Sequence, residues 1–237
     1  MPSSAASELL RLPNGKRPGL VVFDLDNTLL AGDSTTRWTK RLYERGIVSD
    51  PRWLELDEAM VKDYSAGTLD IRAYYREAER AVAGLSAEAL QAEAALYAEE
   101  VLRPLAYPAG LAAAAACREA GIPAAILSAS ADFLVKEAAK IFSIERAMGM
   151  QLKRLPDGRV TGEIEGEPAF QEGKVARIRE TMAELGLGRE SLLFFTDSRN
   201  DLPLCRFAAG ACCVNPDDAL REAAEAAGWR VLSWTLG

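Results

Sequence analysis

Three short apolar segments, each followed by a polar residue, constrain the fold of this chain more than any other feature. The segments and the residues that follow them are 19–23 with Asp24, 123–127 with Ser128, and 192–196 with Asp197. Continuous rather than alternating apolar runs are typical of strands that are buried on both faces of a parallel sheet. Helix-like stretches at 111–120 and 175–185, each closed by a glycine, precede two of the runs. This repeated order predicts an α/β fold with a doubly wound parallel sheet.

The C-terminal part of the chain continues the same pattern. We predict a strand at 211–214, a helix at 217–227 and an edge strand within 229–234. At the other end, the polar and Pro-containing start of the chain predicts a frayed segment up to about Pro18.

Between residues 33 and 103 the character of the sequence changes, because no apolar strand run occurs there. Apolar residues recur instead at helical spacing in four segments: 38–45, 53–65, 71–84 and 88–101. Pro51 and Asp70 are typical helix starts, and Gly46 and Gly67 are typical helix stops. We therefore predict a helical module inserted directly after the first strand.

The domain organisation follows from this insertion. Residues 1–32 and 104–237 would form the α/β core, and residues 33–103 the helical module. Within the core, the segment 151–167 carries Pro-Asp-Gly between two alternating stretches, which predicts a small β-hairpin insertion.

Composition narrows the function. The 237 residues include 28 Lys and Arg, 35 Asp and Glu and no His, for a formal net charge of -7. An acidic chain is a poor general nucleic-acid binder, so we expect no nucleic-acid partner. The absence of histidine excludes Ser-His-Asp triads, His-ligated zinc and phosphohistidine chemistry. General acid–base catalysis would therefore have to use carboxylates, Lys, Tyr, Cys or a metal-bound water.

The cysteines favour a reducing compartment. Cys117, Cys205, Cys212 and Cys213 lack CxxC spacing, and we expect them to be buried, small apolar residues. No apolar run is long enough to cross a membrane. We therefore expect a cytoplasmic protein without a membrane partner. The sequence contains no long heptad repeat, so it does not predict an oligomeric state.

The residues after the apolar strands are candidates for chemistry. Ligands of parallel α/β sheets bind at the carboxyl ends of the strands, where Asp24, Asp26, Ser128 and the segment 197–201 would meet. Converging carboxylates repel one another unless a cation or a shared proton relieves them. With oxygen ligands only, Mg²⁺ is the favoured cation, and it favours phosphate substrates. Taken singly, each acidic segment also fits a turn or a helix cap; their coincidence at strand ends favours a functional site.

These residues resemble the motifs of a known family, the haloacid dehalogenase superfamily. Residues 21–30, Val-Val-Phe-Asp-Leu-Asp-Asn-Thr-Leu-Leu, look like its first motif. The second, third and fourth motifs resemble 126–128, Lys174 and 195–203, in the family's order. The helical module stands where the phosphoserine-phosphatase-like branch of the family has its cap domain. Three short segments also resemble that branch: 31–34, 67–70 and 161–166.

The resemblance implies a role for each matching residue. Asp24 would be the nucleophile that forms an aspartyl-phosphate, and Asp26 the general acid and base. Lys174 would neutralise charge on Asp24 and on the transferring phosphoryl group. The metal, Mg²⁺, would be held by the side chains of Asp24 and Asp197 and by Asp26 through its backbone carbonyl. The remaining implied contacts are Thr28, Ser128, Leu25 and Ala129 with the phosphate, and Asn200 and Asp201 around the metal.

The resemblance also implies a reaction and a substrate class. Superfamily phosphatases carry the second aspartate, here Asp26, whereas dehalogenases and phosphonatases lack it. We therefore expect a phosphatase that acts on a small phosphorylated metabolite. The positions that bind the rest of the substrate would be Asp33, Arg37 and Arg76, although Arg76 also fits a solvated helix face. A phosphotransferase and a non-catalytic protein of the same fold are the alternatives.

Overall fold

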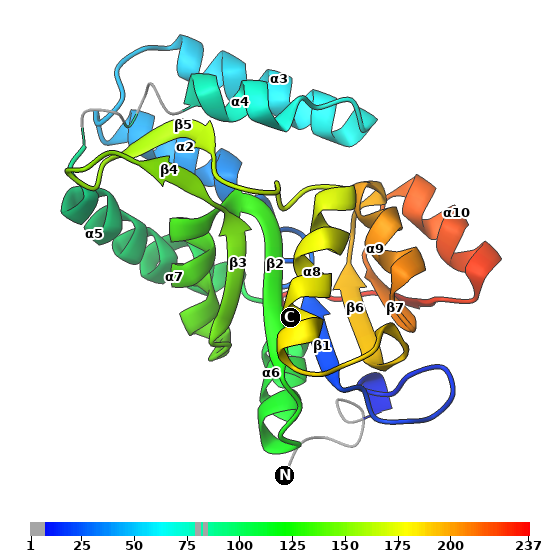
Figure 1. Ribbon diagram of the computed structural model, residues 1–237. Helices are drawn as coiled ribbons and strands as arrows, with labels where there is room; N and C mark the ends of the chain where they lie inside the picture. The colour runs from blue at the N-terminus through cyan, green and yellow to red at the C-terminus, as the bar shows by residue number, and fades with distance from the viewer. Residues whose placement is uncertain (1–7, 79–81, 83–84) are drawn as a thin grey trace.

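The computed structural model describes residues 8–78, 82 and 85–237, and its centre is a six-stranded parallel sheet (Figure 1). The strands are β1 (Leu20–Phe23), β2 (Ala124–Ala131), β3 (Arg146–Met150), β6 (Leu192–Thr196), β7 (Gly210–Val214) and β8 (Arg230–Leu232). They lie in the order β3-β2-β1-β6-β7-β8. Phe23, the last residue of β1, stands opposite Ile126 in β2 and Phe195 in β6. The prediction that the second strand ends at 127 was wrong, because β2 continues to Ala131 and so includes Ser128. The predicted α/β fold is confirmed.

Helices cover both faces of the sheet. They are α6 (Pro108–Glu119), α7 (Asp132–Phe142), α8 (Glu172–Glu184), α9 (Leu202–Phe207) and α10 (Asp218–Ala227). Val21 and Phe23 of β1 belong to the core on one face, and Leu20 and Val22 to the core on the other. All four side chains are fully buried, which explains why this strand is apolar at every position.

Four helices follow β1, as the helical spacing predicts. They are α2 (Ser34–Glu44), α3 (Arg52–Ala66), α4 (Ile71–Ala78) and α5 (Ala87–Tyr97), and the last continues into a π-helical turn at Ala98–Leu102. Gly67 ends α3 with a φ of 76°, a conformation that favours glycine. Part of the predicted helix 71–84 lies outside the described residues, namely 79–81 and 83–84. Figure 1 shows α3 and α4 lying across the carboxyl end of the sheet. The domain boundaries at 32/33 and 103/104 stay predictions.

The predicted hairpin forms as a separate antiparallel pair, β4 (Leu152–Arg154) and β5 (Val160–Ile164). It packs against α4 (Figure 1), and the Arg72 guanidinium donates to the carbonyl oxygen of Gly166 at 3.3 Å. An insertion from the core and a helix of the inserted module therefore meet above the strand ends.

Two features differ from the sequence-based expectations. Strand β3 was not predicted, because this edge strand is only partly buried and carries Gly149 in place of an apolar run. The prediction of a frayed start up to Pro18 was wrong for the described residues from Glu8 onward. Leu10 and Leu12 are buried, and Arg230 donates to the carbonyl oxygen of Arg11 at 2.6 Å.

The cysteines are as the sequence analysis predicts. All four cysteines are free and buried. Among the described residues, no helix combines the length and the apolar character that crossing a membrane requires.

Candidate active site

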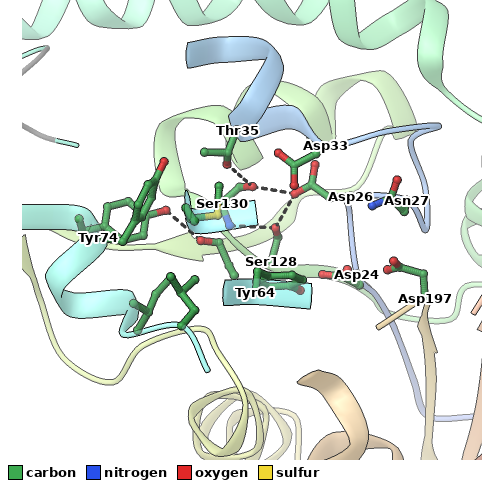
Figure 2. Close-up of a pocket in the computed structure, with 15 residues that line it drawn as sticks. Asp24, Asp26, Asn27, Asp33, Thr35, Tyr64, Tyr74, Ser128, Ser130 and Asp197 are labelled. Atoms are coloured by element: carbon green, nitrogen blue, oxygen red, sulfur yellow. Dashed lines mark hydrogen bonds between the residues drawn. The ribbon is translucent and has the colours of Figure 1, made fainter. Parts of the chain in front are cut away.

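A small cavity of about 40 Å³ lies where β1, β2 and β6 end, beneath α3 and α4. The core contributes Asp24, Asp26, Ser128 and Asp197 to its lining, and the inserted helices contribute tyrosines and apolar side chains. Figure 2 shows Asp24 and Asp197 side by side, with Asp26 turned toward Ser130. The structure thus brings together polar side chains that are more than 170 positions apart in the sequence.

Lys174 forms two deeply buried ion pairs in the site, with Asp24 and with Asp201. Lys174, in the first turn of α8, donates from Nζ to Asp24 Oδ1 at 2.9 Å and to the Asp201 carboxylate at 2.8 Å. Asp201 also accepts a hydrogen bond of 2.7 Å from Thr196 Oγ1. Burial raises the pKa of Asp24 to about 7, because desolvation and the neighbouring carboxylates outweigh the ammonium of Lys174. Burial opposes the charge on Lys174 as well, but Asp201 and Asp24 raise its pKa above the usual value.

Asp197, after β6, faces the same space as Asp24. Thr28 donates from Oγ1 to Asp197 Oδ1 at 3.0 Å. Burial raises the pKa of Asp197 well above its usual value, and repulsion from Asp24 and Asp201 raises it further. Asp24 is buried and Asp197 is partly buried, and a hard divalent cation is the natural counter-charge for two such carboxylates that repel each other.

The donor set fits Mg²⁺ in particular. Among the described residues, no group of three or more His, Cys, Asp or Glu side chains could hold a metal. Mg²⁺ needs only one or two carboxylates, because it keeps several waters and takes phosphate oxygens as ligands. Asp24 and Asp197 suit that demand, and the side chain of Asp26 is engaged elsewhere.

Asp26 is held by three hydrogen bonds. Its Oδ1 accepts from the backbone N–H of Ser34 at 2.6 Å, and its Oδ2 accepts from Ser130 Oγ at 2.7 Å and from Ser128 Oγ at 3.4 Å. Ser130 Oγ in turn contacts Thr35 Oγ1 at 2.9 Å. Sequence reasoning assigned no role to Ser34, Thr35 or Ser130. Ser130 lies in β2, two residues after Ser128, and Ser34 and Thr35 are its neighbours because α2 starts beside β2.

The positions implied for phosphate binding lie around these acids. Ser128 and Ala129 line the cavity, and the carbonyl oxygen of Ala129 accepts a 2.8 Å hydrogen bond from the hydroxyl of Tyr75. Thr28 is buried with its hydroxyl on Asp197, and the Leu25 side chain is buried in the core.

Asn200, expected near the metal, joins the core to the inserted helices. Its Nδ2 donates to the carbonyl oxygen of Tyr64 in α3 at 2.9 Å, and its Oδ1 accepts from Gln171 at 3.4 Å. Together with the bond between Tyr75 and Ala129, this contact fixes α3 and α4 over the strand ends.

The three positions expected to bind the rest of the substrate differ in placement. Asp33 lines the cavity and caps α2, because its Oδ1 accepts from the backbone N–H of Thr36 at 2.7 Å. Burial, and secondarily Asp26, raise the pKa of Asp33 to about 7. Arg37, whose guanidinium packs beside Gly32, and Arg76 are exposed and lie outside the cavity lining. The sequence carries no signal for the lining residues Tyr64 and Met60, and for Tyr74 and Tyr75 it leaves open whether they line the pocket or pack in the core; both line the cavity.

Comparison with protein families and with other proteins adds a second line of evidence. Residues 21–206 match the model of the haloacid dehalogenase-like hydrolases. A histidinol-phosphatase of Neisseria meningitidis serogroup C is 33% identical over 91% of this chain and 98% of its own length. A phosphoserine phosphatase of Mycobacterium tuberculosis is 26% identical over 90% of this chain and 70% of its own length.

Solved structures show the same fold. A protein with unknown function from Bordetella pertussis Tohama I has a TM-score of 0.82 and 31% identity, with 92% of this chain and 98% of that chain covered. A substrate-bound phosphoserine phosphatase has a TM-score of 0.69 and 18% identity, covering 92% of this chain and 93% of its own.

Proposed function

Because this chain belongs to the haloacid dehalogenase-like hydrolases, in their phosphoserine-phosphatase-like branch, we propose a specific reaction for it. The chain is a phosphatase, a phosphoric monoester hydrolase. The proposal is that it uses Mg²⁺ and an aspartyl-phosphate on Asp24 to hydrolyse the phosphate ester of a small metabolite.

One observation carries this proposal: the contact between Asp24 and Lys174 at the end of β1. A carboxylate with Nζ of a buried lysine at 2.9 Å is held in one orientation, with one oxygen engaged and the other directed to the cavity. The ammonium offsets negative charge as a phosphoryl group approaches, which is the main demand of phosphoryl transfer.

In the first step, an oxygen of Asp24 attacks phosphorus and the bond from phosphorus to the ester oxygen breaks. Asp26, as the carboxylic acid, gives its proton to the departing ester oxygen, so that an alcohol leaves. The hydrogen bonds from Ser34 and Ser130 to Asp26 hold its carboxyl group in a fixed position for this transfer.

In the second step, Asp26 acts as a carboxylate. It takes a proton from a water molecule, whose oxygen attacks phosphorus as the bond from phosphorus to Asp24 breaks. Inorganic phosphate leaves, Asp24 returns to a carboxylate and Asp26 is again protonated. The two residues therefore end the cycle as they began it.

Asp24 and Asp197 would hold Mg²⁺ through their side chains, with the backbone carbonyl of Asp26 as a further oxygen ligand. When bound, the cation would supply positive charge for the phosphate oxygens and let both carboxylates stay ionised. Thr28 supports this role by fixing Asp197 Oδ1.

Phosphate release from p-nitrophenyl phosphate tests the proposal. We expect turnover with Mg²⁺, loss of turnover in excess EDTA, and a loss of at least about 1,000-fold in Asp24→Asn, which removes the nucleophile and keeps its shape. A panel that includes histidinol phosphate and phosphoserine, the esters implied by the names of the relatives, would identify the substrate.

Two results would contradict the proposal. Undiminished turnover in Asp24→Asn would show that this residue is not the nucleophile. Transfer of the phosphoryl group to an added acceptor alcohol, faster than to water, would favour the alternative, a phosphotransferase.

A further inference from the structure

Ser130 stands at the centre of a cluster of hydroxyl groups beside Asp26. Its Oγ donates to Asp26 Oδ2 at 2.7 Å and lies 2.9 Å from Thr35 Oγ1 and 3.1 Å from Ser34 Oγ. Ser130 comes from β2, whereas Ser34 and Thr35 begin α2. Figure 2 shows Ser130 between Asp26 and Thr35. Ser130 is 4% exposed and Ser34 is fully buried, so bulk water does not compete for these contacts.

The first turn of α2 is held in place by two contacts. Tyr97 of α5 donates from its hydroxyl group to the carbonyl oxygen of Ser34 at 2.6 Å. Asp33 caps the same turn with its side chain. The backbone that carries Ser34 and Thr35 is therefore fixed next to Ser130.

The two carboxyl oxygens of Asp26 have different partners. Oδ1 accepts from the backbone N–H of Ser34 at 2.6 Å, and an N–H group can only donate. Among the described residues, the partners of Oδ2 are hydroxyl groups, those of Ser130 and, at 3.4 Å, of Ser128. A hydroxyl group donates or accepts according to the rotation of its proton. The proton that Asp26 gains and loses in the proposed reaction is therefore best placed on Oδ2, where the neighbouring groups can adapt to it.

Ser130 can serve both forms of Asp26, because a hydroxyl group has one proton and two acceptor positions. Beside the carboxylate, Ser130 donates to Oδ2 and accepts from Thr35 and Ser34, since in both of these contacts either oxygen can be the donor. Beside the carboxylic acid, Ser130 accepts the proton of Oδ2 and donates its own to Thr35. Thr35 lines the cavity, so its own proton can turn there. Only hydroxyl protons rotate between the two arrangements, and no heavier atom has to move.

We propose that Ser130 is a positioning residue for proton transfer by Asp26, and that Thr35 and Ser34 orient its hydroxyl group. As Oδ2 gives its proton to the departing ester oxygen, the Ser130 proton turns to Oδ2 and stabilises the carboxylate that forms. The reverse rotation accompanies the transfer of a proton from water to Oδ2. The proposal rests on the phosphatase reaction above and makes its general acid depend on the seating of α2 beside β2.

Two esters of similar shape reveal a weakened general acid. Phenolate is a stronger base than p-nitrophenolate, so phenyl phosphate depends more than p-nitrophenyl phosphate on a proton from Asp26. General acid catalysis contributes about 100- to 10,000-fold, and loss of the Ser130 hydroxyl group should remove part of it. With Mg²⁺, we expect Ser130→Ala to lower kcat/KM for phenyl phosphate by about tenfold more than for p-nitrophenyl phosphate. A loss of packing alone would lower both values alike.

A matched pair of variants, Thr35→Val and Thr39→Val, tests the orienting role of α2. Both replacements remove a hydroxyl group from this helix and keep the branched shape of the side chain. Thr39 is 1% exposed, and its Oγ1 has no hydrogen-bond partner among the described residues. We expect Thr35→Val to lower the ratio of kcat/KM for phenyl phosphate over p-nitrophenyl phosphate by about threefold or more, the effect of one hydrogen bond. Thr39→Val, the control, should leave this ratio unchanged.

The outcomes separate this proposal from the proposed function. Absence of Mg²⁺-dependent hydrolysis of p-nitrophenyl phosphate by the natural chain contradicts the proposed function itself. Where that hydrolysis occurs, equal losses for the two esters in Ser130→Ala, or no loss for either, overturn the role of Ser130. Equal ratios in Thr35→Val and Thr39→Val overturn the orienting role of α2. This second comparison decides the proposal by itself if Ser130→Ala does not fold.

Discussion

Lys174 Nζ lies 2.9 Å from Asp24 Oδ1, and both side chains are almost fully excluded from solvent. The pair links the first turn of α8 to the end of β1, across 150 positions of sequence. Because the same ammonium also contacts Asp201, one lysine balances two buried carboxylates. The proposed nucleophile and the local fold therefore depend on the same contact.

Replacing this lysine should destabilise the protein. In Lys174→Met, Asp24 and Asp201 stay buried without their cation, and removal of one partner of a buried ion pair costs about 3–5 kcal/mol. Urea denaturation should show this loss in the free energy of unfolding. Lys153→Met is the control, because Lys153 forms an ion pair with Glu163 at the surface of the hairpin and should change little. Equal stability of the two variants would contradict the importance of the buried pair.

Beryllofluoride should act as a mimic of the aspartyl-phosphate. We expect it to raise the melting temperature only when Mg²⁺ is present, since a ligand at 100 times its Kd adds about 2.7 kcal/mol of stability. Thermal shift measurements of Asp24→Ala should show no such rise. Equal protection of that variant by beryllofluoride would show that another residue is the nucleophile.

The pKa of Asp33 predicts a pH dependence of stability. Burial raises it from 3.8 to about 7, so between these values the folded chain holds a proton that the unfolded chain has lost. The contribution of Asp33 is fully present below about pH 4 and is lost as the pH rises through 7. Asp33→Asn does not titrate, so its stability relative to the natural chain should increase from pH 4.5 to 7.5, by at most about 1.4 kcal/mol per pH unit. Urea denaturation in EDTA at both pH values measures the difference in free energy of unfolding between the variant and the natural chain. A difference that is the same at both pH values would contradict the prediction.

The sheet and its strand-end acids could be read from the sequence because their signals are local. A continuous apolar run requires burial on both faces, and the polar residue that ends it must lie at the edge of the sheet. This reasoning placed Asp24, Ser128 and Asp197 at one edge, where the structure has them. Strand β3 was not predicted, because it is defined by its pairing with β2 and not by a continuous apolar run.

The wall of the cavity depends on long-range packing, which no local signal encodes. Tyr64 and Tyr74 show the same helical spacing as core residues, and only the seating of α3 and α4 on the sheet turns them toward the acids. The contact between the hydroxyl groups of Ser34 and Ser130, 3.1 Å apart, likewise exists because α2 starts beside β2. Arg37 and Arg76, chosen by their positions in the chain, lie on outward faces.

Two hydrogen bonds described above, from Tyr75 to Ala129 and from Asn200 to Tyr64, tie α4 to β2 and α3 to the segment that follows β6. The cavity beneath these two helices, of about 40 Å³, has room for a few water molecules. An ester is larger than this space, so we expect α3 and α4 to move away from the strand ends, and both bonds to break, when an ester enters. If this opening accompanies each turnover, the rate of opening is an upper limit on kcat.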